Sequence, residues 1–298
     1  LLSRVGPPLF VAGVVLLIGV ALFGEVRNGS RRWLNLGFMA FQPSELLKLA
    51  LPLTLAWYFQ RNEAVLRTKH YLVGGVLVLV PLLLILRQPD LGTALMIGAS
   101  GFYLLFFAGL PWKVILGGGV LGAASLPVAW GLMHDYQQRR VLTLLDPSSD
   151  PLGAGYHIIQ STIAIGSGGM FGKGWMQGSQ SQLDFIPERT TDFVFAVFGE
   201  EFGYVGAIFL VGLYLAIVAR GLVIAARAPT LFGRLMAATL SLNLFTYAFV
   251  NMGMVSGILP VVGVPLPLMS YGGTALITLL LGMGILMSVA THRQLNKS

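Results

Sequence analysis

The sequence contains no cysteine and very few charged residues. Asp, Glu, Lys and Arg make up 10% of the 298 residues, against about 25% in a typical soluble domain. Without cysteine the chain cannot form a disulfide scaffold, a thiolate zinc site, an iron–sulfur cluster or a cysteine nucleophile. So few charges cannot cover a water-facing surface, and the composition therefore argues against a soluble globular enzyme.

Apolar sequence is abundant instead, since 55% of the residues are hydrophobic. A helix that crosses a bilayer needs about 20 mostly apolar residues. Runs of this kind predict an all-α polytopic membrane protein with eight transmembrane helices. The predicted spans cover residues 7–23, 43–60, 71–86, 92–110, 113–131, 193–218, 231–251 and 268–290.

Two segments outside the regular spans stand out. Residues 132–192 are rich in Gly, Ser and Gln but also contain apolar runs, and a connection of this length is usually functional or disordered. We interpret it as one long ordered loop that is partly embedded in the membrane. The Pro and Gly residues of 260–273 predict a re-entrant segment, which is tolerated only where the backbone is buried or lines a cavity. The whole of 1–298 is predicted to be a single transmembrane domain.

The distribution of charge predicts the orientation. We call the side that holds 132–192 the far side. The far-side short loops carry only Arg27, Arg31, Arg32 and Arg87. Ten basic residues lie on the near side: Arg4, Arg61, Arg67, Lys69, Lys113, Arg220, Arg227, Arg234, Arg293 and Lys297. Because short cytoplasmic loops are enriched in Lys and Arg, the near side and the C-terminus are predicted to be cytoplasmic. The net charge of +7 then reflects topology, and no nucleic-acid partner is expected.

The first candidate site lies at the start of the predicted span 193–218. Pro187 breaks regular structure, and Thr190, Thr191 and Asp192 then sit where a helix begins. One interpretation is that these side chains only cap the helix. The alternative is that Asp192 is a catalytic carboxylate at the membrane–water boundary, where the helix end lowers its proton affinity and apolar surroundings raise it.

Other ionisable residues fall inside predicted spans. Glu45 and Lys48 share one helix face at i,i+3 spacing, so they either neutralise each other or line a polar cavity. Glu200 and Glu201 lie roughly 12–13 Å along the helix from Asp192, too far to pair with it, and are expected to bond the backbone or side chains of neighbouring helices. Gly199 and Gly203 form a GxxxG pattern that predicts close helix packing.

Polar side chains of the long loop form a further candidate. Arginine forks suit phosphate groups, whereas amides and hydroxyls suit sugar hydroxyls. The alternative is a solvated basic loop that touches anionic headgroups. The substrate- or diphosphate-binding candidates, with one serine from the Pro/Gly segment, are Arg139, Arg140, Gln160, Ser161, Lys173, Gln180 and Ser270. The four histidines show no metal-binding spacing, and no ATP motif is present.

Several motifs along the whole chain together resemble the SEDS family (shape, elongation, division, sporulation), in its RodA-like branch. They are Arg32–Leu34, Phe41–Glu45, Gln88–Thr93, Asp146-Pro147, Gly155–Ser161, Gly172–Trp175, Pro187–Phe193 and Pro265–Gly273. The resemblance implies ten spans in the family, of which the first span here is similar to the third. The chain is therefore expected to be N-terminally truncated.

The resemblance also implies a function. Members of this family are peptidoglycan glycosyltransferases that polymerise lipid II into glycan strands at the outer face of the bacterial cytoplasmic (inner) membrane, during cell-wall elongation in the RodA-like branch. The family's essential aspartate falls on Asp192, which would act as general base for the acceptor 4-hydroxyl. Glu45, Lys48, Glu188 and Thr191 would support the site.

The leaving group in this chemistry is undecaprenyl diphosphate. Basic residues, or a divalent cation such as Mg²⁺ or Mn²⁺, could neutralise it. The implied partners are lipid II, the growing glycan strand, a class B penicillin-binding transpeptidase, the elongation machinery and membrane lipids. Two alternatives remain open at this stage: a lipid II flippase, and a non-catalytic scaffold for the transpeptidase.

Overall fold

The computed structural model describes residues 2–27, 30–35, 40–133, 135–151, 153–186 and 188–291. The chain forms two compact units, each built from separate stretches of sequence. The first unit comprises 1–109, 215–246 and 272–298, and the second comprises 110–214 and 247–271. The two units are described in turn.

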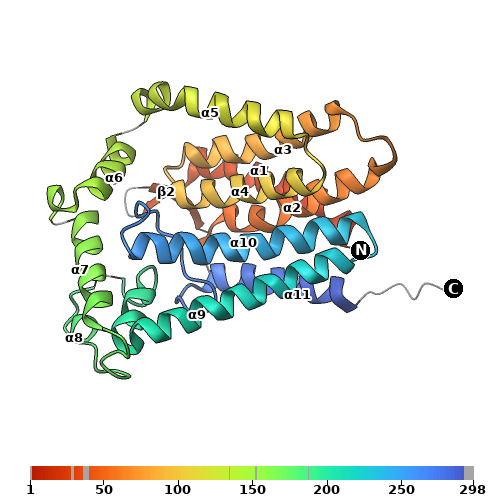
Figure 1. The fold of residues 1–298 in the computed structure, drawn as a ribbon. Helices are drawn as coiled ribbons and strands as arrows, with labels where there is room; N and C mark the ends of the chain where they lie inside the picture. Colours follow the sequence, from red (N-terminus) through yellow and green to blue (C-terminus); the bar gives the residue numbers. More distant parts are fainter. Residues whose placement is uncertain are drawn as a thin grey trace. The chain divides into compact units, whose positions relative to one another are not determined.

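The first unit is built mainly from helices that lie side by side (Figure 1). Pro43 at the first helical position and Glu45 in the first turn favour a helix start at this point, and Asp90 caps another by accepting a hydrogen bond from the Thr93 N–H at 3.0 Å. Its helices are α1 (Leu2–Phe23), α2 (Pro43–Arg61), α3 (Thr68–Leu86), α4 (Leu91–Phe107), the later part of α9 (Val194–Arg227), most of α10 (Leu231–Val255) and α11 (Gly273–Thr291).

Helix α2 forms the centre of this unit. Leu47, Leu51, Leu55 and Phe59 are fully buried, and α2 packs against α1, α4 and α11. The consecutive residues from 53 to 56 are buried as well, so α2 is enclosed on more than one side. The close contact with α1 depends on small residues, because a side-chain carbon at Gly6 would lie 2.8 Å from the α2 backbone.

A short antiparallel sheet departs from the all-helical prediction. Strands β1 (Glu25–Arg27) and β3 (Ala40–Phe41) flank β2 (Ser30–Asn35), and Val26 pairs with Arg31. These strands were not predicted because each is too short to show a clear alternation of polar and apolar residues.

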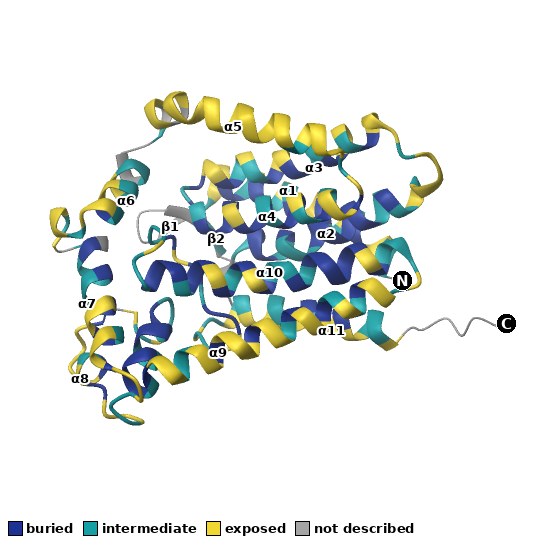
Figure 2. Ribbon diagram, viewed as in Figure 1, coloured by how far each residue is buried: buried dark blue, intermediate teal, exposed yellow. Residues whose placement is uncertain are grey.

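The second unit contains α5 (Trp112–Leu132), α6 (Asp135–Leu145), α7 (Ala154–Ser167), α8 (Ser179–Gln182), the first part of α9 and the end of α10. Helix α5 is exposed along nearly its whole length (Figure 2). The predicted loop 132–192 contains the helices α6, α7 and α8 among its described residues. Residues 260–272 are non-helical and several of them are buried, which fits the expected irregular segment; its re-entrant course in a membrane stays a prediction.

Each of the eight predicted spans contains a helix. Five of these helices are long and apolar enough to cross a membrane, namely α1, α3, α9, α10 and α11, and residues 91–107 and 112–128 form shorter apolar helices. Helix α2 carries Glu45 and Lys48 and is mostly buried. The helical membrane-protein prediction is thus confirmed, while the count of eight spans stays a prediction.

Helix α9 is interrupted at Gly203, where φ is 66° and ψ is −164°. A side-chain carbon at this position would lie 2.3 Å from the Gly172 nitrogen, so only glycine allows the loop that follows α7 to approach so closely. A side-chain carbon at Gly199 would lie 3.2 Å from Ile165 of α7. The close helix packing predicted by the GxxxG pattern is therefore confirmed at Gly199, whereas Gly203 interrupts the helix and packs against a loop.

Candidate active site

The turn before α9 presents Asp192. The N–H groups of Thr191 and Phe193 donate to the Glu188 carbonyl oxygen at 3.0 and 3.3 Å, and Glu188 adopts a φ of 53°. Positive φ in a residue with a side chain costs roughly 1–2 kcal/mol and often marks a functional site. The predicted helix start is confirmed, since Val194 begins α9; Pro187 lies outside the described residues.

Three hydrogen bonds tie this turn to other elements of the second unit. The Asn251 amide of α10 donates to the Asp192 carbonyl oxygen at 2.8 Å and to the Val264 carbonyl oxygen at 2.7 Å. The Ser270 hydroxyl donates to the Thr191 carbonyl oxygen at 2.5 Å, and the Tyr271 N–H donates to the Thr190 carbonyl oxygen at 2.8 Å. The backbone on both sides of the Asp192 side chain is therefore held in place.

The Asp192 carboxylate faces Gly263 of the irregular segment. A side-chain carbon at Gly263 would lie 3.3 Å from Oδ2 of Asp192, and Gly263 has a φ of 71°. Among the described residues, the hydrogen bonds of this turn run through its backbone, and none of them ends on this carboxylate. Its oxygens are left to act on another group.

The surroundings of Asp192 make it a better base than an exposed aspartate. Burial, and to a lesser extent the negative charge of Glu188, together raise the pKa of the Asp192 carboxyl from 3.8 to about 6. A carboxylate with a pKa near neutrality is ionised at pH 7 yet accepts a proton more readily. The sequence left open whether the helix end lowers the proton affinity of Asp192 or apolar surroundings raise it. In the structure, desolvation raises it.

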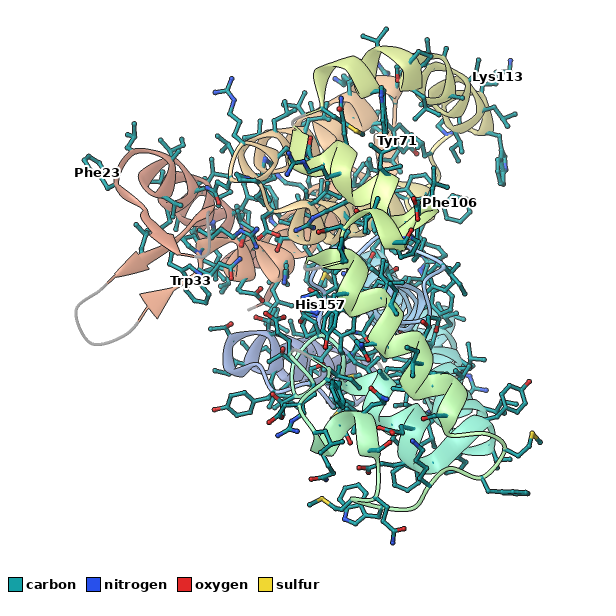
Figure 3. All side chains as sticks on the ribbon, turned by 90° about the vertical axis from the view of Figure 1, so that its left-hand side faces the viewer. Phe23, Trp33, Tyr71, Phe106, Lys113 and His157 are labelled. Carbon is teal, nitrogen blue, oxygen red and sulfur yellow. The ribbon has the colours of Figure 1, made fainter. Side chains whose placement is uncertain are left out.

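His157 and Asn251 were missed by the sequence analysis as site residues. His157 on α7 (Figure 3) stacks on Phe193 with ring centroids 5.2 Å apart. Burial lowers the pKa of His157, against the opposing charges of Glu188 and Asp150, so the ring is neutral at pH 7. Asn251 could have been recognised as a polar side chain within an apolar span, which usually has a specific partner.

Lys173 is engaged within the loop. Its ammonium group lies 2.7 Å from Oε1 of Glu200 and 2.9 Å from the Ser179 hydroxyl. The same carboxylate accepts the N–H groups of Gln180 and Ser181 at 2.9 and 3.2 Å. Glu200 therefore bonds the short helix α8, as expected of a neighbouring helix, and also the loop residue Lys173, whose charge is already neutralised.

The remaining loop candidates differ in accessibility. Arg139 is exposed and Arg140 is half-buried, both on α6. Gln160 on α7 and the Gln180 side chain are half-buried. Ser161 is fully buried and its hydroxyl lies 2.8 Å from the Val255 carbonyl oxygen, so it joins α7 to the end of α10 and presents no free hydroxyl.

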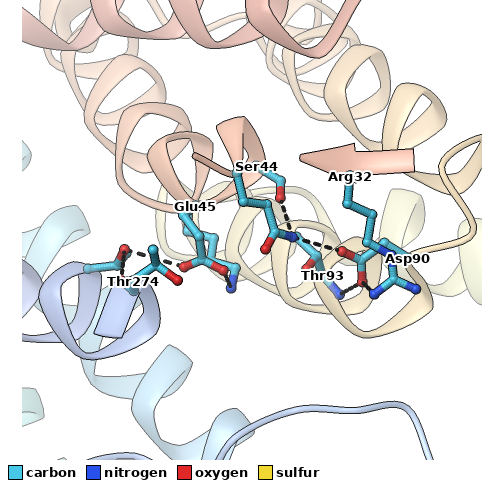
Figure 4. Close-up of polar contacts among 9 residues, drawn as sticks. Arg32, Ser44, Glu45, Asp90, Thr93 and Thr274 are labelled. Carbon is cyan, nitrogen blue, oxygen red and sulfur yellow. Dashed lines mark hydrogen bonds and ion pairs between the residues drawn. The ribbon is translucent and has the colours of Figure 1, made fainter. Parts of the chain in front are cut away.

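A second polar group lies in the first unit (Figure 4). The Lys48 ammonium is 2.6 Å from Oε1 of Glu45, and the Thr278 hydroxyl donates to Oε2 of Glu45 at 3.3 Å. Both members of the ion pair are largely buried. The close pair fits the mutual neutralisation considered for these residues, and Thr278 extends it to α11.

The same region contains a second ion pair, visible in Figure 4. Arg32 lies 3.7 Å from Oδ1 of Asp90, and the Gln42 amide donates to Oδ2 of Asp90 at 3.1 Å. These contacts connect the residues before α2 and the start of α4. The motif residues Arg32, Gln42 and Asp90 therefore have partners within the fold of the first unit.

The structure thus assembles Glu188, Thr191, Asp192 and Ser270 in the second unit, whereas Glu45 and Lys48 belong to the first. In the described part of the chain, no group of three or more His, Asp or Glu side chains could hold a metal ion. The divalent cation stays a sequence-based expectation.

Comparison with known proteins gives one consistent family. Residues 1–295 match the model of the FtsW/RodA/SpoVE family, described as cell cycle proteins. The chain is 56% identical over 290 residues to the peptidoglycan glycosyltransferase MrdB of Escherichia coli K12. The matched residues make up 97% of this chain and 78% of that protein. It is 34% identical to the peptidoglycan glycosyltransferase RodA of Treponema pallidum, covering 94% of this chain and 82% of that protein.

Solved structures are similar as well. A chain from a peptidoglycan synthase complex, studied for its coordination of polymerization and crosslinking, has a TM-score of 0.80 at 40% identity, over 97% of this chain and 81% of that one. The crystal structure of the rod shape determining protein RodA of Thermus thermophilus has a TM-score of 0.70 at 34% identity, over 98% of this chain and 80% of that one.

Proposed function

Because the chain belongs to the FtsW/RodA/SpoVE family of cell cycle proteins, we propose that it is a peptidoglycan glycosyltransferase that polymerises lipid II during cell-wall elongation. The relatives named above carry that activity in their names. The single observation in this chain that carries the proposal is the Asp192 carboxylate, which is held at the head of α9 with its pKa raised to about 6.

Asp192 acts as the general base in this proposal. It accepts the proton of the acceptor sugar's 4-hydroxyl, and the oxygen forms a bond to the anomeric carbon of the donor. The bond from that carbon to the diphosphate breaks, and undecaprenyl diphosphate leaves with the electron pair, with inversion at the carbon. Diphosphate leaves without protonation, so a second carboxylic acid of the glycosidase type is not required.

The residues around Asp192 have supporting roles. Glu188 raises its proton affinity through charge, while Thr191 and Ser270 help to fix the turn. Gly263 leaves space beside the carboxylate for the acceptor hydroxyl, because a larger residue would contact Oδ2. In the first unit, Glu45 and Lys48 neutralise each other's charge where both side chains are largely buried.

Recognition of the diphosphate falls to residues of the long loop. Arg139 and Arg140 on α6 are the proposed contacts, since guanidinium groups bind phosphate oxygens in a bidentate manner. Lys173 contributes less because Glu200 already holds it. Gln160 and Gln180 are proposed to bind sugar hydroxyls.

The proposed arrangement in the membrane follows from charge and helix length. The eight helices α1 to α5 and α9 to α11 cross the cytoplasmic membrane, the C-terminus is cytoplasmic, and residues 132–192 face outward. A class B penicillin-binding transpeptidase is the proposed partner. The similarity to a chain from a peptidoglycan synthase complex supports this pairing.

Reconstitution tests the function. The full-length protein and its transpeptidase partner are placed in liposomes with labelled lipid II, and both glycan polymer and transbilayer movement of the label are measured. The proposal predicts polymer. Movement of the label without polymer would instead identify a flippase. The absence of both polymer and movement would indicate a scaffold. Either of these results would overturn the proposal.

A further inference from the structure

The connection between α7 and α8 exposes a cluster of large apolar side chains. Met170, Phe171, Trp175 and Met176 have exposed fractions of 58%, 81%, 70% and 61%. We call these four residues the apolar loop tip. Soluble surfaces rarely expose so many large apolar side chains in one short segment, and such exposure usually marks a contact with a membrane or a partner.

The exposure of the apolar loop tip is built into the fold. The N–H groups of Lys173 and Gly174 donate to the carbonyl oxygens of Glu200 and Glu201, each at 3.0 Å. In return, the N–H groups of Tyr204 and Val205 in α9 donate to the carbonyl oxygens of Gly169 and Met170 at 2.9 and 3.1 Å. The loop is thus bonded on both sides to the broken turn of α9, and it cannot fold its apolar side chains inward without losing these bonds.

The loop also carries almost no free charge. Between Gly166 and Leu183, Lys173 is the only charged residue, and its ammonium is paired with the buried Glu200 carboxylate. Gln177 and Ser179 are exposed but uncharged. Contact with lipid would therefore require no burial of an unpaired ion, which would otherwise be costly.

The apolar loop tip is continuous with the exposed side of α9. The Trp175 ring lies 5.8 Å from that of Phe202, which in turn stacks on Phe198 at 4.7 Å. Beyond the break, Tyr204, Val205, Ile208 and Phe209 are all exposed. Because α9 is long and apolar enough to span a membrane, its exposed apolar side faces lipid, and the loop is bonded to α9 where that side begins.

We propose that the apolar loop tip inserts into the interfacial region of the bilayer, where headgroups meet acyl chains. Tryptophan and other large apolar side chains favour this region, and the glycine-rich backbone holds them at the level of Tyr204. A protein partner would also cover an apolar patch, but the lack of free charge and the continuity with α9 favour lipid. The inference does not depend on the proposed glycosyltransferase activity.

These 298 residues contain no cysteine, so each introduced thiol is unique among them. Phe171→Cys and Trp175→Cys are compared with Phe209→Cys on the exposed side of α9 and with Ser149→Cys on the exposed turn after α6. Each variant of the full-length protein is labelled with bimane and reconstituted without partner in phosphatidylethanolamine–phosphatidylglycerol vesicles. Quenching by lipids that carry a spin label near the headgroup is then measured.

The proposal predicts that labels at positions 171 and 175 are quenched at least half as strongly as the label at 209, and several-fold more than the label at 149. Quenching at 171 and 175 no greater than at 149 would overturn it. If those two positions then became shielded from a water-soluble quencher only on addition of the transpeptidase, the patch would be a protein interface instead.

Discussion

The central residue, Asp192, owes its position to bonds made by its backbone, and none of the hydrogen bonds described for this turn ends on its carboxylate. The Asn251 amide holds the carbonyl group of Asp192 itself, and Ser270 and Tyr271 hold the two residues before it. This arrangement fixes where the side chain starts without consuming the carboxylate oxygens. A base positioned in this way is preorganised for proton transfer.

Replacement of Asn251 tests that account. Asn251→Ala removes the bonds to the carbonyl oxygens of Asp192 and Val264, and we expect the kcat for lipid II polymerisation to fall about 10- to 100-fold with little change in KM, because small misplacements of a reacting group are costly. The matched control is Asn243→Ala on the same helix, whose amide bonds Ser100. Equal kcat losses in the two variants would contradict a positioning role.

The pH dependence of the reaction tests the ionisation of Asp192. The base acts only when ionised, so kcat should rise as the pH passes about 6, the pKa of Asp192, and level off above it. Because the charge of Glu188 contributes to the raised pKa, Glu188→Gln should move the midpoint to lower pH. A pH–rate profile of both proteins is the measurement; an unchanged or higher midpoint in the variant would contradict the assignment.

The sequence predicted these residues unevenly. Asp192 was recognisable from its place at a helix start and from the family motif, and Thr191 and Ser270 came with those motifs. His157 and Asn251 gave weaker signals, because their roles depend on contacts with Phe193 and Asp192 that are distant in the sequence. Ser161 was recognisable as polar, but only the fold shows that its hydroxyl is buried.

Among the elements, α9 and the loop before α8 depend on each other. The break at Gly203 admits the loop backbone, and Glu200 gathers Lys173, Gln180 and Ser181 around one buried carboxylate. The loop therefore behaves as part of the helix end and not as a separate linker. The start of α9, which presents Asp192, is stiffened as a result.

Removal of the Lys173 charge tests this link. Lys173→Met leaves the buried Glu200 carboxylate with backbone donors but no cation, and we expect a loss of roughly 2 kcal/mol in stability together with faster proteolysis between residues 168 and 186. The exposed Lys113→Met is the control, and Lys173→Met combined with Glu200→Gln should recover much of the loss. Equal melting temperatures for Lys173→Met and Lys113→Met would argue against the link between the loop and α9.

The helices could be predicted from the sequence because each is a long apolar run, and all eight predicted spans contain one. The strands β1 to β3 and the loop attached to α9 could not. Their bonds join residues such as Gly169 and Tyr204, and neither local propensity nor hydrophobic periodicity reports such distant pairs.

In the whole molecule, the scarce charges are predicted to be distributed by side of the membrane. Ten basic residues were assigned to the near side, whereas the acids near Asp192 lie in or beside the long loop. The excess of positive charge thus predicts orientation, and the acids mark the face where the chemistry is proposed.

Thiol accessibility tests this orientation. Ser149→Cys in the long loop should react with a membrane-impermeant maleimide applied outside intact spheroplasts. Ala64→Cys, which is also exposed but lies between α2 and α3, should react only after the membrane is permeabilised. The reverse pattern would place Asp192 on the cytoplasmic side and contradict the proposed topology.

The role of Asp192 is tested most directly by polymerisation of labelled lipid II in liposomes that contain the full-length protein and its partner. Asp184 is a suitable control carboxylate, because it is exposed and paired with Arg189 at 2.6 Å. We predict that wild type and Asp184→Asn produce glycan polymer, whereas Asp192→Asn, folded and inserted to the same extent, produces none. Polymer made by Asp192→Asn at a rate near that of wild type would contradict the account.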